Sequence, residues 1–216
     1  MQVPIEWLPA DGSAPQQLIL LLHGWADESM GLAPLAQALR LQFPNAAVLV
    51  PESDTATDGG RRGRMWYSIE GMTPENWPQR VNAVLPMLET WVRVQQRRLG
   101  VGEAATAIGG FSQGAILALA LALQHDGIAG RVLAFGGCLV TPPGQAPLQT
   151  TVHLFHGEDD TVIPAQGSRD ALEQLGALQG DATLDIAGGV GHQLHPALID
   201  CALHRLTHHI PARTWR

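Results

Sequence analysis

The strongest constraint on this chain is the segment 105–123, where an apolar stretch, a glycine-flanked serine and a longer apolar stretch follow one another. The first stretch predicts a short strand and the second a buried helix. Between them, residues 110–114 (GFSQG) have the pattern G-x-S-x-G. This pattern is typical of a nucleophile elbow, in which strained backbone holds the serine between strand and helix. The flanking glycines are needed because side chains there would collide with the neighbouring chain.

Short apolar runs elsewhere alternate with stretches of helical periodicity. The run LILLL at 18–22 is typical of a strand buried on both faces. Such alternation implies right-handed crossovers and a mainly parallel sheet with helices on both faces. We therefore predict an α/β fold in one domain, 1–216, with a sheet of about seven strands. The expected strands are 3–8, 18–22, 46–50, the stretch before the GFSQG turn, 131–135, 152–156 and 182–186, and the expected helices are 30–41, 74–99, the stretch after the turn, 166–178 and 196–210.

Composition excludes several classes of protein. The 216 residues include 13 Lys and Arg against 20 Asp and Glu, a net charge of −7, so we expect no general attraction to nucleic acid or anionic membranes. The longest apolar run, 115–123, is much shorter than the ~18 residues of a membrane helix, and the start lacks a signal-peptide pattern. Cys138 and Cys201 indicate neither a disulfide framework nor a zinc site, so the expected location is the cytoplasm.

Four regions allow alternative interpretations. The aperiodic loop 51–71 carries Arg61, Arg62 and Arg64, which could contact phosphate or RNA, but a solvated basic loop is favoured in an acidic chain. The helix 74–99 starts after Thr73-Pro74, and Pro86 should kink it or divide it in two. Metal binding is conceivable at the histidines of 204–209 and in the acidic turn 156–160, but ordinary helix-end and surface-turn roles are favoured, so no metal is expected.

A serine needs a base to take its proton and an acid to orient that base. After Ser112 the chain presents Glu158, Asp159 and Asp160 in one turn, and then His192. Both segments follow predicted strands, so they should meet Ser112 at one edge of the sheet. The order Ser, acid, His is that of doubly wound hydrolases, although spacing alone leaves the acid open among the three residues.

Four blocks of the chain carry a resemblance: 22–27 (LHGWAD), 110–115 (GFSQGA), 156–164 (HGEDDTVIP) and 191–192 (GH). In this order they resemble the signature blocks of the carboxylesterase/phospholipase family, the branch of the α/β hydrolases that includes acyl-protein thioesterases. Residues 63–67 (GRMWY) are similar to the G-R-x-W-F loop of that family. The resemblance extends over 18–210, is nearest to small bacterial serine esterases, and implies an α/β-hydrolase fold.

Residue by residue, the resemblance implies that Ser112 is the nucleophile, Asp160 the acid and His192 the base. It places the oxyanion donors at the backbone N–H groups of Trp25 and Gln113. The chain departs from many relatives at Trp25, whose indole could narrow an acyl pocket. It also differs from eukaryotic thioesterases after His192, at 193–196 (QLHP), which argues against protein thioesters as substrates.

Apolar and aromatic residues flank the predicted catalytic loops, and they form either an acyl groove roofed by the 59–77 loop or ordinary packing beneath it. The residues predicted to bind substrate are Met65, Trp66, Tyr67, Met72, Val162, Ile163 and Leu194.

We expect a serine carboxylesterase that cleaves short to medium acyl esters through an acyl-enzyme, without a cofactor or metal. Its expected partner is a small-molecule ester, with neither nucleic acid nor stable membrane insertion, and the sequence leaves the oligomeric state open. The alternatives are a thioesterase acting on acylated proteins or acyl-coenzyme A, and a non-catalytic binding protein that kept the fold.

Overall fold

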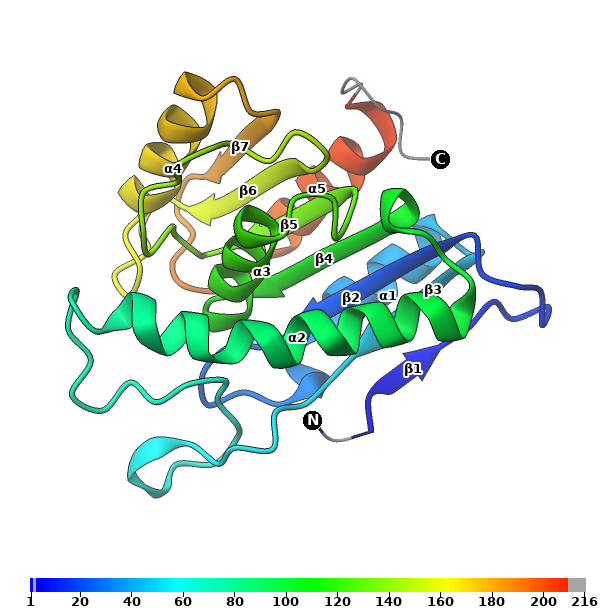
Figure 1. The fold of residues 1–216 in the computed structure, drawn as a ribbon, viewed down its shortest axis with the longest axis horizontal. Helices are drawn as coiled ribbons and strands as arrows, with labels where there is room; N and C mark the ends of the chain where they lie inside the picture. Colours follow the sequence, from blue (N-terminus) through cyan, green and yellow to red (C-terminus); the bar gives the residue numbers. More distant parts are fainter. Residues whose placement is uncertain (2, 210–216) are drawn as a thin grey trace.

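The structure, a computed structural model, describes residues 1 and 3–209. Seven strands form one sheet in the order β1-β3-β2-β4-β5-β6-β7 (Figure 1). Only β1 is antiparallel to its neighbour, and the other neighbouring pairs are parallel. The predicted α/β architecture with a mainly parallel sheet is therefore confirmed. The strands are β1 (Ile5–Trp7), β2 (Gln17–Leu22), β3 (Ala46–Val50), β4 (Thr106–Phe111), β5 (Arg131–Phe135), β6 (Thr151–Gly157) and β7 (Ala182–Ala187).

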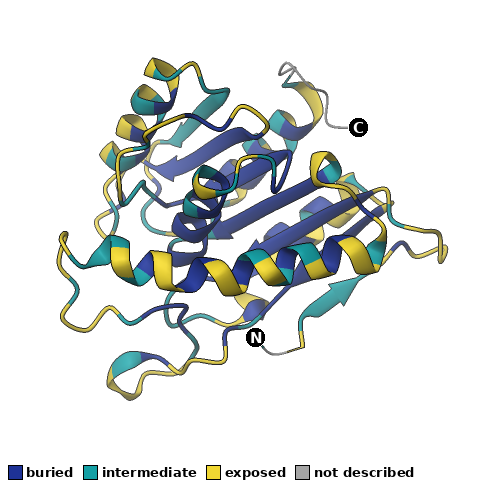
Figure 2. Ribbon diagram, viewed as in Figure 1, coloured by how far each residue is buried: buried dark blue, intermediate teal, exposed yellow. Residues whose placement is uncertain are grey.

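Helices cover both faces of the sheet, as Figure 1 shows. The five α-helices are α1 (Ala33–Gln42), α2 (Trp77–Leu99), α3 (Gln113–Gln124), α4 (Gln166–Ala177) and α5 (Pro196–His208). One apolar cluster joins α2, α3 and α4 to one face, and a second joins α1 and α5 to the other. Along β2, Leu18 and Leu20 enter the first cluster, whereas Ile19 and Leu21 enter the second. The continuous apolar run is explained by this double coverage, and the central strands are buried along their length (Figure 2).

Several predicted boundaries differ from the observed ones. The helix expected from residue 74 begins at Trp77, because Thr73 and Asn76 form a turn in which the Asn76 Oδ1 accepts the Thr73 N–H at 2.9 Å. Pro78 then occupies the first turn of α2, where a proline costs no hydrogen bond. The division expected at Pro86 does not occur, since α2 is one continuous helix of 23 residues. The predicted end of the last helix, residue 210, lies outside the described residues.

His153 is a fully buried histidine on β6, and its Nδ1 lies 2.8 Å from the Thr183 Oγ1 on β7. Burial, together with the nearby charge of Arg131, lowers the pKa of His153 to about 3. The ring is therefore neutral in the folded protein across the physiological range. In the unfolded chain the same ring would take up a proton near its ordinary pKa of 6.5.

This difference predicts a loss of stability in mild acid. Because the unfolded state binds the extra proton between pH 6.5 and pH 3, the folded state should lose stability as the pH falls through this interval. Between pH 7 and pH 5 the contribution of His153 should be about 2 kcal/mol. Urea denaturation should show a shallower pH dependence for His153→Leu than for the wild type by about this amount. Equal losses in the two proteins would contradict the prediction.

Candidate active site

Ser112 occupies the turn between β4 and α3, where the backbone has φ 54° and ψ −116°. A positive φ is strained for a residue with a side chain, as a nucleophile elbow requires. Both flanking glycines are dictated by close contacts. A Cβ on Gly114 would overlap the carbonyl group of Leu22, and one on Gly110 would overlap the carbonyl group of Gly114. The elbow is therefore pressed against the end of β2, and Ser112 projects at the carboxyl edge of the sheet.

Three distant segments meet at this edge in one hydrogen-bonded line. The His192 Nε2 lies 3.0 Å from the Ser112 Oγ, and the His192 Nδ1 lies 2.6 Å from the Asp160 Oδ2. Asp160 follows β6, and His192 lies in the loop between β7 and α5. The two loops touch because Gly157 packs directly against the Val190 carbonyl, where a Cβ would not fit. The arrangement can pass a proton from the hydroxyl to an imidazole that a carboxylate orients.

Of the three acidic residues in the turn after β6, only Asp160 faces His192. Its side chain is 1% exposed, and its Oδ1 accepts the backbone N–H groups of Val162 and Ile163, each at 2.9 Å. Burial alone would raise the pKa of Asp160, but the hydrogen bonds from His192 and the two N–H groups outweigh it and lower that pKa. The carboxylate is therefore ionised at neutral pH.

The other two acidic residues of the turn point to solvent. Glu158 and Asp159 are exposed, and Glu158 forms an ion pair with Arg169 at 2.8 Å. Of the three acidic residues, Asp160 is the one hydrogen-bonded to His192, a distinction that spacing alone could not make.

The loop after β2 lies directly beside the serine, since a Cβ on Gly24 would be 3.4 Å from the Ser112 Cβ. The preceding His23 is fully buried, and its Nε2 accepts the Ser53 N–H at 3.2 Å. The Nδ1 must then carry the proton, and it donates to the Gly24 carbonyl at 2.7 Å. Burial lowers the pKa of His23, which favours this neutral form. Because a trans peptide directs its C=O and N–H oppositely, holding the Gly24 carbonyl also sets the direction of the Trp25 N–H.

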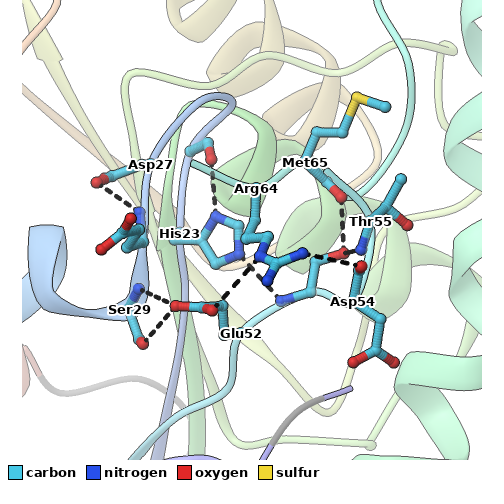
Figure 3. A network of polar contacts seen from close by, with 11 residues as sticks. His23, Asp27, Ser29, Glu52, Asp54, Thr55, Arg64 and Met65 are labelled. Atoms are coloured by element: carbon cyan, nitrogen blue, oxygen red, sulfur yellow. Dashed lines mark hydrogen bonds and ion pairs between the residues drawn. The ribbon is translucent and has the colours of Figure 1, made fainter. Parts of the chain in front are cut away.

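Figure 3 shows the polar network around this loop. The Glu52 carboxylate accepts from the Ser29 hydroxyl at 3.1 Å and lies 3.6 Å from the Arg64 Nε. The Arg64 backbone N–H donates to the Asp27 carbonyl at 2.8 Å. Gly63, with φ 98°, packs against the backbone of residue 26 where a side chain would not fit. The long loop thus supports the loop after β2.

Two of the three basic residues of the long loop have partners within the chain. Arg64 belongs to the network of Figure 3, and the Arg61 guanidinium lies 5.3 Å from the centre of the Trp25 ring. Two of the three arginines of this loop therefore have a structural role, and their presence does not require contact with phosphate or RNA.

The side chain of Gln113 ties the long loop to the elbow. Its Oε1 accepts the Trp66 N–H at 3.0 Å, and its Nε2 donates to the Tyr67 carbonyl at 2.8 Å. The Trp66 indole donates to the His23 carbonyl at 2.9 Å and stacks on the His23 ring at 4.9 Å. Gln113 was predicted only as a backbone donor, and no signal in the sequence indicated these contacts of its amide.

A cavity of about 620 Å³ opens above Ser112 and His192. Of the residues singled out from the sequence, it is lined by Trp25, Gln113, Tyr67, Met72, Val162 and Ile163. Met65, Trp66 and Leu194 lie outside the lining, and the first two are buried. The sequence did not indicate the other apolar residues of the lining, which are Ile69, Trp77, Phe111 and Ile116. Of these, Ile116 was expected only to be buried, as part of the apolar helix after the elbow.

Within residues 1 and 3–209, no cluster of three or more His, Cys, Asp or Glu side chains could hold a metal ion. His204 and His208 instead stack on each other at 4.3 Å on the exposed side of α5. No helix in this part of the chain is long and apolar enough to cross a membrane.

The sheet topology and the serine elbow at its carboxyl edge define the α/β-hydrolase class. The chain belongs to the phospholipase/carboxylesterase family, whose sequence profile matches residues 7–210. It is 39% identical over 196 residues to the esterase YpfH of Escherichia coli K12, covering 91% of this chain and 84% of that protein.

Two further relatives are informative. The crystal structure of esterase PE8 superposes with a TM-score of 0.87 at 30% identity, covering 94% of this chain and 97% of that one. Acyl-protein thioesterase 1 of Eremothecium gossypii is 28% identical, covering 85% of this chain and 84% of that protein. The predicted family and fold are confirmed, and the chain is an ester hydrolase.

Proposed function

We propose that this chain cleaves short to medium acyl esters of small molecules through an acyl-enzyme on Ser112. The observation that carries the proposal is the hydrogen-bonded line from Ser112 through His192 to Asp160, with links of 3.0 and 2.6 Å, at the base of an apolar cavity. An acyl chain would lie against the apolar wall while the ester carbonyl meets the hydroxyl. The residues of this line supply all the acid–base chemistry that ester cleavage needs, without a cofactor.

In the first half-reaction the Ser112 Oγ attacks the ester carbonyl carbon, and its proton passes to the His192 Nε2. The carbonyl electron pair moves onto oxygen, where the N–H groups of Trp25 and Gln113 stabilise the charge. Each such donor is typically worth ~3 kcal/mol. When the intermediate collapses, the C–O bond to the alcohol breaks and His192 returns the proton to the leaving oxygen.

In the second half-reaction water attacks the acyl-enzyme and gives its proton to His192. Collapse of this intermediate breaks the acyl–serine bond, Ser112 Oγ regains the proton, and the carboxylic acid leaves. Asp160 accepts the Nδ1–H of His192 in both steps, which holds the tautomer and offsets the imidazolium charge.

The nucleophile assignment predicts that a fluorophosphonate probe will label Ser112 in the native protein, because only an activated serine reacts. Ser112→Ala should lose the label and lower kcat by on the order of 10⁶. Peptide mapping of the labelled protein provides the measurement. A folded wild-type protein that takes up no label would favour a non-catalytic binding protein, and more than a tenth of the activity in the variant would refute the assignment.

The acid assignment predicts a contrast between neighbouring residues. Asp160→Asn should lower kcat by on the order of 10⁴, because the amide cannot hold the productive imidazole tautomer. Asp159→Asn provides the matched control, since its exposed side chain is one residue away, and it should remain near wild type. Steady-state kinetics on one ester measures both, and the reverse ranking would transfer the acid role to Asp159.

The acyl-site assignment predicts a dependence on chain length. Met72→Ala should raise KM for an octanoate ester more than for an acetate ester, since each buried methylene contributes ~0.8 kcal/mol. Met87→Ala is the control, because Met87 is an exposed residue of α2 outside the cavity lining. Measuring KM across a series of p-nitrophenyl esters tests this, and equal changes at all chain lengths would remove the acyl site from this wall.

Thioester cleavage is a second candidate function that would use the same residues. The likeness to acyl-protein thioesterase 1 over 85% of this chain favours it. The ratio of kcat/KM values for an oxoester and a thioester with the same acyl group separates the two. A strong preference for the thioester would replace the esterase proposal.

A further inference from the structure

A second imidazole contacts the carboxylate that orients His192. His156, at the end of β6, is 0% exposed, and its Nε2 lies 3.2 Å from the Asp160 Oδ2. The same Nε2 lies 2.8 Å from the Ile163 carbonyl oxygen. The Asp160 Oδ2 is therefore shared between two histidines, while its Oδ1 accepts two backbone N–H groups.

The surroundings of His156 determine which ring nitrogen carries the proton. Its Nε2 faces a carbonyl and an ionised carboxylate, both acceptors, so this nitrogen must be protonated. Its Nδ1 lies 2.7 Å from the Ser168 Oγ of α4, which can supply a proton to it. The Ser168 Oγ also lies 3.1 Å from the Gly137 carbonyl, which is the alternative acceptor for its single proton. The His156 N–H is thus fixed: it donates to the Ile163 carbonyl and lies beside the Asp160 Oδ2.

We propose that His156 is a positioning residue that holds the Asp160 carboxylate and limits how strongly it draws a proton onto His192. The Asp160 Oδ2 accepts the His192 N–H at 2.6 Å and also has the polar His156 N–H group beside it, with the Nε2 3.2 Å away, which offsets part of the carboxylate charge. This inference rests on the proposed roles of Ser112, His192 and Asp160.

Among the titratable groups on the elements packed against His156, Asp160 is the acidic side chain that contacts it. From the loop after β6, Glu158 and Asp159 are exposed, and Glu158 is paired with Arg169 of α4. From α4 the facing group is the neutral Ser168 hydroxyl, and after β5 it is a carbonyl. Beyond Asp160 lies His192 itself.

His153 provides a matched comparison on the same strand. It is also fully buried, but its Nδ1 contacts Thr183 rather than Asp160. A histidine that only fills space in the core should behave like His153 when it is replaced.

The test compares pH profiles of kcat/KM for the wild type, His156→Leu, His156→Gln and His153→Leu, with folding checked by thermal denaturation. His156→Leu removes the N–H, so the acidic limb of the profile, where activity falls as the pH is lowered, should move to higher pH by on the order of one unit. At a pH below the limb, the activity of this variant should therefore be about tenfold lower than that of the wild type. Activity should recover at alkaline pH. His156→Gln keeps an N–H donor and should restore the limb, and His153→Leu should leave it unmoved.

An acidic limb of folded His156→Leu that coincides with the wild type would overturn the proposal. So would an equal loss of activity at every pH in the leucine and glutamine variants, which indicates a structural role. If His156→Leu does not fold, Ser168→Ala tests the same contact by freeing the ring, and its limb must also move upward. Failure of the proposed function is distinguishable, because the wild type would then take no fluorophosphonate label on Ser112.

Discussion

The close crossing of the elbow over the end of β2 is the constraint on which the site depends. Gly110 and Gly114 leave no room for side chains between α3, the elbow and the Leu22 carbonyl. Because β2 and β4 are adjacent parallel strands, this crossing brings the loop after β2 beside Ser112. The proposed nucleophile and a proposed oxyanion donor are thus neighbours through backbone packing, before any side chain of the site is considered.

Buried histidines are used repeatedly where strands end at this edge. His23 follows β2 and holds a carbonyl of the proposed oxyanion loop, and His156 closes β6 and holds the Asp160 carboxylate. The partners of each ring specify its tautomer: the Ser53 N–H donates to the Nε2 of His23, and the Ile163 carbonyl accepts from the Nε2 of His156. A buried ring with a fixed tautomer positions its partner more tightly than a solvated side chain, because it has no competing contact with water.

The long loop between β3 and α2 joins these parts into one structure. It contributes the Tyr67 wall of the cavity, and hydrogen bonds from Gln113 hold that wall to the elbow. It also supports the loop after β2 through Arg64 and through the stacking of Trp66 on His23. Changes in this loop would therefore alter both the shape of the cavity and the position of the Trp25 N–H.

The sequence by itself determined the α/β architecture, the elbow at Ser112 and the order of serine, acid and histidine. These features follow from local patterns: apolar runs, helical periodicity and glycines that flank one turn. The sequence located element boundaries less well. At α2, the turn formed by Thr73 and Asn76 delays the start of the helix from the predicted residue 74 to Trp77.

Only the tertiary structure decided which residues of neighbouring loops touch. Spacing could not distinguish Asp160 from Glu158 and Asp159, because all three occupy one turn and differ only in the direction of their side chains. It could not show that Trp66 lies outside the cavity lining and stacks on His23, or that His156 contacts Asp160. The contact of Trp66 with His23 joins segments far apart in sequence, so it depends on how the strands are ordered and how the loops pack across the sheet edge. The contact of His156 with Asp160 spans four residues and depends on how the turn after β6 folds back on the strand.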